Sequence, residues 1–212
     1  MTWQIDKRID FCYGHRVWTQ NLNDEFCAEG ENESKCKHMH GHEGSVQVYL
    51  ESDTLDRGFV TDFKHLGWLK DFLNAYVDHK FIVDINDPAF EQIVGGKYLL
   101  TDIVETTGDW NQMVEKPVLA IDNRQVTLSP IAPDLFDKEY GWYVAGDYNN
   151  LEGTRKELLE GFLFVDFVPT SENLSKWIYE IVNIKMKELN VVTSRIEWWE
   201  TPKSKSTYFG DK

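Results

Sequence analysis

The chain has 212 residues, 42% of them hydrophobic and 27% charged, so it can bury a core and does not have the composition of a disordered chain. Its formal net charge of −14 would repel a phosphate backbone, which disfavours nucleic-acid binding. The sequence has neither an apolar signal core at its N-terminus nor an apolar run long enough to span a membrane, so we expect a soluble, cytoplasmic protein with no membrane partner.

The first predicted element is a strand over residues 3–11. Apolar residues fall on alternate positions from Trp3 to Phe11, interrupted only by Lys7, which is the period of a half-buried strand. His15 follows at its end. Residues 19–35 are rich in Asn, Asp, Glu and Gly without a sustained period, which indicates an exposed loop.

This loop leads into residues 36–42, which contain a thiol and three imidazoles: Cys36, His38, His40 and His42. Three cysteines in a chain with no export signal indicate reduced thiols, so Cys36 is available for chemistry. Residues 46–50 continue the alternation in phase with His40 and His42. A second strand is therefore predicted, with both imidazoles on one face.

Two imidazoles at this spacing can bind one metal ion, and neutral imidazole suits Zn²⁺. A zinc ion with three protein ligands keeps a fourth position open, which is typical of a catalytic site. His15 is the best third ligand, because it ends a strand that could pair beside the second one. His38 is the alternative, although three imidazoles on one strand fit a tetrahedral site poorly.

The next segment predicts a short extended piece over residues 59–63 and a helix over residues 64–76, where apolar residues recur at helical spacing. Asp78 and His79 follow directly. A hydrogen-bonded carboxylate–imidazole pair needs a turn here, and a helix end supplies one. The alternative is an ordinary histidine at a helix C-terminus beside a surface charge.

Residues 90–164 contain no chemical motif. Residues 118–121 and 125–128 are strand-like and predict a hairpin. We interpret the whole segment as an inserted subdomain or a cover near the site.

The C-terminal part predicts a helix and a strand. Thr170 is a natural N-cap, followed by Ser171 in the first turn of a helix that runs to about residue 189. Residues 191–200 predict the last long strand. Glu200 would then be a carboxylate on a largely apolar face and would need a partner, which makes it a candidate ligand anchor. The alternative is an exposed strand end.

With these pieces in place, the chain resembles the 6-pyruvoyl-tetrahydropterin synthase / 6-carboxy-tetrahydropterin synthase family. Six motifs match in the family's order: His15-Arg16 after Phe11, Cys36 ahead of His40-Gly41-His42, residues 58–63, Asp78-His79-Lys80, residues 169–173, and Glu200-Thr201.

The resemblance implies an α+β T-fold, also called a tunnelling fold, with an antiparallel sheet, two long helices on one face, and closure into oligomeric barrels. Residues 1–212 would form a single T-fold domain with an inserted segment at about 90–164. It also implies a homo-oligomer, with trimers stacked into hexamers.

The resemblance further implies a lyase whose substrate is a pterin triphosphate. His15, His40 and His42 would bind zinc, and Cys36 would be the proton-abstracting base. Asp78 and His79 would form a proton relay. Glu200 would bind the guanidine-like edge of the pterin, helped by Thr170 or Ser171. For the triphosphate, the candidate cations are Arg16, Lys35, Lys37 and Lys80.

One spacing indicates which branch of the family applies. Three residues separate Cys36 from His40, as in the bacterial 6-carboxy-tetrahydropterin synthases of the 7-deazaguanine (queuosine) pathway. Lys80, by contrast, is more typical of the pyruvoyl branch. We therefore expect 6-carboxy-tetrahydropterin synthase activity, with the pyruvoyl activity as one alternative. The alternative of another class is a non-catalytic zinc-dependent binding or assembly protein.

Overall fold

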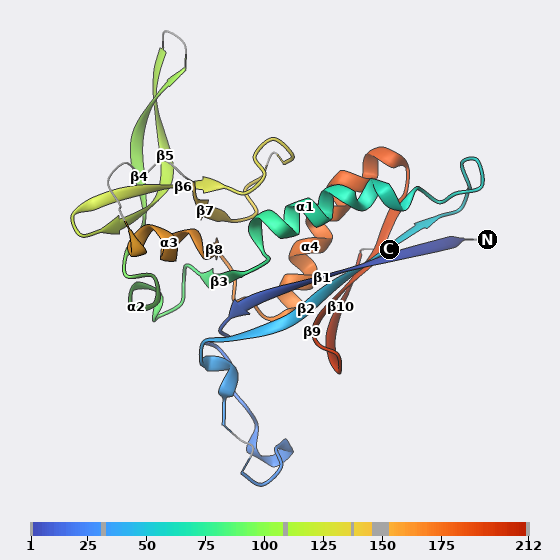
Figure 1. The fold of residues 1–212 in the computed structure, drawn as a ribbon, viewed down its shortest axis with the longest axis horizontal. Coiled ribbons are helices and arrows are strands. Elements are labelled where there is room, and N and C mark those ends of the chain that lie inside the picture. The colour runs from blue at the N-terminus through green and yellow to red at the C-terminus, as the bar shows by residue number, and fades with distance from the viewer. Residues whose placement is uncertain (1, 31–32, 108–109, 137, 146–152, 211–212) are drawn as a thin grey trace.

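The computed structural model describes residues 2–30, 33–107, 110–136, 138–145 and 153–210. Within these residues, ten strands form one sheet in the order β10-β9-β2-β1-β3-β8-β7-β6-β5-β4 (Figure 1). The strands are β1 (Trp3–His15), β2 (His40–Ser52), β3 (Lys80–Asp84), β4 (Lys97–Thr107), β5 (Trp110–Ile121), β6 (Arg124–Pro130), β7 (Trp142–Val144), β8 (Phe162–Val165), β9 (Val192–Thr201) and β10 (Ser204–Phe209). The helices are α1 (Gly67–Tyr76), α2 (Phe90–Val94), α3 (Thr154–Glu160) and α4 (Ser171–Met186), with short 3-10 helices η1 (Asp24–Phe26), η2 (Lys35–Lys37), η3 (Phe63–Leu66) and η4 (Lys187–Leu189).

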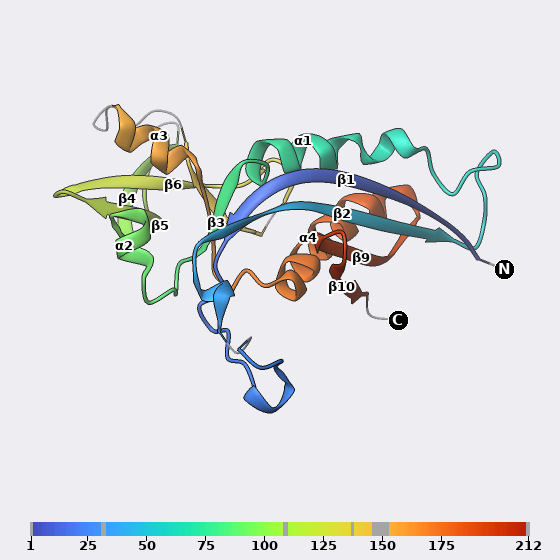
Figure 2. The ribbon, with the colours of Figure 1, turned by 60° about the horizontal axis from the view of Figure 1, so that its bottom comes forward.

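β1 and β2 are the longest strands and form an arched antiparallel pair (Figure 2). Their pairing runs without a break from Trp3 opposite Ser52 to His15 opposite His40. The alternation predicted for β1 is observed, because Ile9, Phe11 and Tyr13 are buried while the residues between them are exposed.

The two main helices, α1 and α4, pack on the buried face of β1, β2 and β9 and share one hydrophobic core. The ring centroids of Phe72 in α1 and Trp177 in α4 lie 6.0 Å apart. Thr170 caps α4 as predicted, since its hydroxyl accepts a hydrogen bond from the backbone N–H of Asn173 at 3.2 Å. Within the described residues, no helix has both the length and the apolarity needed to span a membrane.

Two expectations about this part of the fold were wrong. The sheet is mixed rather than antiparallel, because α1 returns the chain so that β3 runs parallel to β1, and β8 in turn runs parallel to β3. Residues 59–63 do not form an extended strand. Phe59 closes a tight turn with Asp56, and Phe63 already begins η3, for which the Asp62 carboxylate caps the N–H of Lys64 at 2.8 Å.

The segment at 90–164 continues the sheet beyond β8 with β7, β6, β5 and β4. The predicted hairpin is present: Val118 pairs with Thr127, and both turn residues, Asp122 and Asn123, have positive φ angles of 48° and 62°. Such angles give a turn that matches the twist of the flanking strands. The β4–β5 ribbon extends away from the rest of the molecule (Figure 1).

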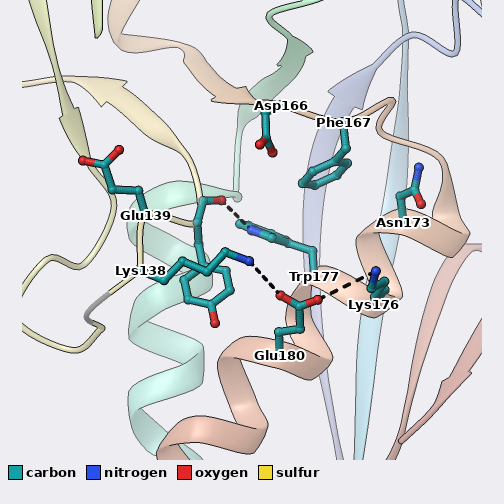
Figure 3. Close-up of a pocket in the computed structure, with 9 residues that line it drawn as sticks. Lys138, Glu139, Asp166, Phe167, Asn173, Lys176, Trp177 and Glu180 are labelled. Carbon is teal, nitrogen blue, oxygen red and sulfur yellow. Dashed lines mark hydrogen bonds and ion pairs between the residues drawn. The ribbon is translucent and has the colours of Figure 1, made fainter. Parts of the chain in front are cut away.

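The strands of the 90–164 segment pack around a second hydrophobic cluster, which includes Phe90, Leu119, Leu128 and Phe164. The 90–164 segment also contacts α4, because Trp177 donates its indole N–H to the carbonyl of Tyr140 at 2.6 Å. Beside it, Lys138 and Lys176 approach the two carboxylate oxygens of Glu180 at 3.3 and 3.9 Å (Figure 3). The 90–164 segment is therefore joined to the rest of the molecule both by strand pairing and by these contacts with α4.

Phe164 joins the two parts of the sheet and is fully buried. We expect Phe164→Ala to lower the free energy of unfolding by about 3–5 kcal/mol, because the remaining rings cannot fill the cavity. Urea denaturation measures this loss. Leu100→Ala on β4 is the control, since Leu100 is 56% exposed and its truncation should cost less than about 0.5 kcal/mol. Equal losses in the two variants would contradict this assignment of the core.

Candidate metal centre and active site

The register of β1 and β2 places three histidines together. His15 lies directly opposite His40, and Tyr13 lies opposite His42, so all four side chains share one face of the sheet. One nitrogen of each of the three imidazoles lies within 4.8 Å of the other two. Within the described part of the chain, this is the one group of three or more potential metal ligands that converges in this way. His38 is exposed and stays outside it.

Backbone carbonyls orient two of these imidazoles. His15 Nδ1 lies 2.6 Å from the Pro169 carbonyl oxygen, and His40 Nδ1 lies 2.8 Å from that of His38. A carbonyl can only accept, so each Nδ1 carries the proton and each Nε2 is the unprotonated nitrogen; His15 Nε2 lies 3.2 Å from His42 Nε2. This arrangement is typical of histidines that bind metals through Nε2.

Burial favours the neutral form of His15 and of His42 by lowering the pKa of each. It lowers the pKa of His15 to about 4, and the neighbouring His40 and His42 lower it further, against the opposing effect of the Pro169 carbonyl. Burial, followed by the proximity of His40, also lowers the pKa of His42. A metal ion would therefore meet ligands that need not first lose a proton.

Tyr13 supports the site and was missed by the sequence reasoning. Its hydroxyl accepts a hydrogen bond from the Trp198 indole N–H at 2.9 Å, and its ring lies 5.2 Å from His15 and 5.5 Å from His42. Burial raises its pKa. Its position two residues before His15 in an alternating strand was the available signal.

Glu200 lies at the rim of the three-histidine cluster. Its Oε1 atom is 3.9 Å from His15 Nε2, at the end of β9. Burial raises the pKa of this carboxyl, and the nearby Glu172 raises it further. β9 therefore places a carboxyl group beside the histidines. Its surroundings disfavour the ionised form unless a cation or a hydrogen-bond donor contacts it.

The segment before α4 also reaches the site, because Pro169 contacts His15. Thr170 is the helix cap, and the Ser171 hydroxyl donates to Glu172 Oε2 at 3.3 Å. The Ser171 carbonyl accepts from Ser206 of β10 at 2.5 Å, which fixes this turn to the edge of the sheet.

Cys36 is half-buried in η2, four residues before His40. Its backbone is held beside the end of β1: Val17 N–H donates to the Cys36 carbonyl at 2.7 Å, and the Cys36 N–H donates to Gln20 Oε1 at 2.9 Å. The structure thus brings the Cys36 loop next to the segment that follows His15, but the thiol is not part of the converging ligand group.

Asp78 and His79 form the predicted pair at the end of α1. Asp78 Oδ2 lies 3.0 Å from His79 Nδ1, and Asp78 Oδ1 accepts the Cys12 N–H at 2.8 Å. His79 has a positive φ of 59°, so the turn needed to bring the neighbours together is present. His79 lines an open groove that is also lined by His40 and His42.

Two of the candidate phosphate-binding cations already have partners. Arg16 Nε forms an ion pair with Asp87 Oδ2 at 3.0 Å, and Lys80 Nζ donates to the Glu160 carbonyl at 2.7 Å. Lys35 and Lys37 lie on η2 beside Cys36.

The fold and the site define an α+β protein that carries a potential three-histidine metal site where paired strands end. The family model described as 6-pyruvoyl tetrahydropterin synthase matches residues 4–211. The chain belongs to this family, which confirms the resemblance found in the sequence and makes the protein a lyase of that family.

Individual relatives agree with this assignment. The chain is 27% identical to the 6-carboxy-5,6,7,8-tetrahydropterin synthase of Aquifex aeolicus over 98% of both chains. It is 34% identical to an uncharacterized protein from Wolinella succinogenes whose crystal structure superposes with a TM-score of 0.73, covering 100% of this chain and 99% of that one. The 6-pyruvoyl tetrahydropterin synthase of Plasmodium vivax, 13% identical with a TM-score of 0.50 and 99% covered, supports the fold alone. The first two matches extend through residues 90–164.

The Asp78 contacts predict a pH-dependent contribution to stability. The Cys12 N–H and then His79 hold the pKa of Asp78 below its ordinary value of 3.8, against the opposing effect of burial. A lowered pKa in the folded state means that the carboxylate stabilises the fold above this ordinary value and stops doing so as pH falls through the folded-state pKa. Relative to Asp78→Asn, we expect the wild type to be about 1 kcal/mol more stable near pH 5.5, and we expect this advantage to shrink as the pH falls below 3.8.

Urea denaturation across this pH range measures the difference. Asp71→Asn is the control, because Asp71 is an exposed carboxylate of the same helix and should show little difference at any pH. A difference for Asp78→Asn that stayed constant with pH would contradict the pairing.

Proposed function

We propose that this protein is a zinc-dependent 6-carboxy-5,6,7,8-tetrahydropterin synthase of 7-deazaguanine (queuosine) biosynthesis. It would convert 7,8-dihydroneopterin triphosphate to 6-carboxytetrahydropterin, acetaldehyde and triphosphate. The convergence of His15, His40 and His42, with Glu200 at 3.9 Å from His15, carries this proposal. The name of the Aquifex relative and the spacing of Cys36 from His40 support this branch.

The donor set fits zinc. Three neutral imidazoles would hold the ion through their Nε2 atoms and leave one tetrahedral position open. When bound, zinc would supply a Lewis acid that stabilises negative charge developing on the side-chain oxygens of the substrate. The chain's own residues would bind the pterin and move the protons.

Glu200 would bind the pterin ring. A carboxylate can accept two parallel hydrogen bonds from an amino-pyrimidine edge, which fixes the orientation of the ring. The raised pKa of Glu200 is consistent with this role, because donors on the pterin would stabilise its ionised form. Thr170 or Ser171, on the turn that contacts His15 through Pro169, would add a further polar contact.

Cys36 would act as the base that removes a proton from the substrate side chain. It must be a thiolate to do so, and Lys35 and Lys37 lie on the same turn. His79 would pass protons, with Asp78 fixing its tautomer through the contact at Nδ1. The exposure of His79, 80% for its side chain, is consistent with a site completed by a neighbouring subunit in trimers stacked into hexamers.

The pyruvoyl activity is the second candidate, because Lys80 resembles that branch. Product analysis separates the two, since acetaldehyde is released only by the carboxy enzyme. We expect purified protein incubated with 7,8-dihydroneopterin triphosphate to release acetaldehyde and 6-carboxytetrahydropterin. Formation of 6-pyruvoyl-tetrahydropterin without acetaldehyde would overturn the choice.

Replacing Cys36 distinguishes an enzyme in which this thiol is the catalytic base from a non-catalytic zinc protein. Cys36→Ser should lower kcat by at least about 100-fold, the usual contribution of a positioned base, while metal content and assembly persist. Cys27→Ser is the control, since Cys27 lies in the loop near η1 and should leave turnover unchanged. Loss of metal and fold together in Cys36→Ser would favour the structural role.

The metal ligands predict a defined stoichiometry. Elemental analysis should find about one zinc per chain, and His40→Ala should remove it because two imidazoles bind zinc weakly. His65→Ala is the control, since His65 pairs with Thr61 on the surface of η3. Wild-type protein that bound no zinc after incubation with it would contradict the assignment.

A further inference from the structure

Two buried carboxylates lie in the turn after β3, and the proposed reaction uses neither. Asp84 and Asp87 are 3% and 5% exposed. One oxygen of each is satisfied within the turn: Asp84 Oδ1 accepts from the backbone and side-chain N–H groups of Asn86 at 2.9 and 3.1 Å, and Asp87 Oδ1 accepts from Ala89 at 2.8 Å. The second oxygen of each carboxylate contacts a different part of the chain.

The Oδ2 atoms of Asp84 and Asp87 both contact the segment that follows His15. Asp84 Oδ2 accepts the Trp18 indole N–H at 2.9 Å. Asp87 Oδ2 lies 3.0 Å from Arg16 Nε, an ion pair in which the N–H is not aligned for a hydrogen bond. These two contacts are here called the Asp84/Asp87 clamp. A buried carboxylate is costly unless its partners are in place, so the clamp fixes residues 16–18 strongly.

The same segment holds Cys36. Val17, between the two clamped residues, donates its N–H to the Cys36 carbonyl, and Gln20 accepts the Cys36 N–H. Gln20 is in turn fixed by its own N–H, which donates to the Val17 carbonyl at 3.0 Å. Both backbone hydrogen bonds of Cys36 therefore end on residues 17–20.

Packing contributes little to the placement of the Cys36 loop. Neither η1 nor η2 contains a buried residue, and η1 lies away from the sheet (Figure 2). The position of the thiol therefore depends on the hydrogen bonds to residues 17–20 and, through them, on the clamp.

We propose that Asp84 and Asp87, with Trp18 and Arg16, are positioning residues that set the location of the Cys36 thiol. This inference rests on the proposed function insofar as Cys36 is the base. The carboxylates touch neither substrate nor thiol in this role. They link the turn at residues 84–87, just before the 90–164 segment, to the loop that precedes His40 and His42 of β2.

Trp18→Phe tests the clamp most cleanly, because it removes the indole N–H and keeps a ring. Trp68→Phe is the matched control, since the Trp68 indole N–H is buried and has no hydrogen-bond partner among the described residues. Hydrogen exchange of the peptide 34–38 and the rate of Cys36 alkylation by iodoacetamide report on the loop without requiring turnover.

In Trp18→Phe we expect the Cys36 amide to exchange and the thiol to react at least about fivefold faster, since local opening controls both. We expect kcat to fall about tenfold with KM within about twofold, the pattern of a misplaced catalytic group. Zinc content should equal that of the wild type. Trp68→Phe should match the wild type in every measurement.

Unchanged exchange and alkylation in Trp18→Phe would overturn the proposal, as would a loss of zinc with a parallel rise in KM, which indicates general disruption. Asp87→Asn breaks the other contact and should give the same pattern if Trp18→Phe does not fold. Wild-type protein without turnover would refute the proposed function, whereas faster Cys36 exchange in the variants would still establish the clamp.

Discussion

The register of β1 against β2 is the constraint on which the rest of the structure depends. It runs over 13 residues of each strand without a bulge and ends with His15 opposite His40. A slip of one residue would turn His40 and His42 to the other face and would also expose Val46 and Val48. The core and the metal site therefore select the same register, and the hydrophobic burial of the strands holds the histidines in place.

Burial also sets the chemistry of the site. The same tight packing that places His15 at the end of β1 lowers its pKa, and the Pro169 carbonyl determines which of its nitrogens is free. Pro169 directly precedes the cap of α4, so the start of that helix orients a metal ligand. A site preorganised in this way does not need to reorganise when an ion binds.

Features that depend on local sequence were predictable. The alternation around His40 and His42, the Thr170 cap and the hairpin turn at Asp122 follow from local periods and turn chemistry. The parallel pairing of β3 with β8 was not predictable, because 77 residues, from Ile85 to Gly161, lie between the two strands in a segment without a motif. The carbonyls that orient His15 and His40 also left no signal, since any residue can supply a carbonyl. Asp84 and Asp87 gave no signal either, because their partners Trp18 and Arg16 are far away in the sequence.

The position of β3 explains how the 90–164 segment can matter to the site. This strand of five residues has His79 directly before it and Asp84 at its end, and it pairs with β1 on one side and β8 on the other. Its first residues thus adjoin the proposed proton relay, and its last residue joins the clamp on the Cys36 loop. Because β8 anchors the 90–164 segment through Phe164, the packing of that segment fixes β3. The 90–164 segment therefore extends the sheet that holds both His79, directly before β3, and Asp84, at the end of β3.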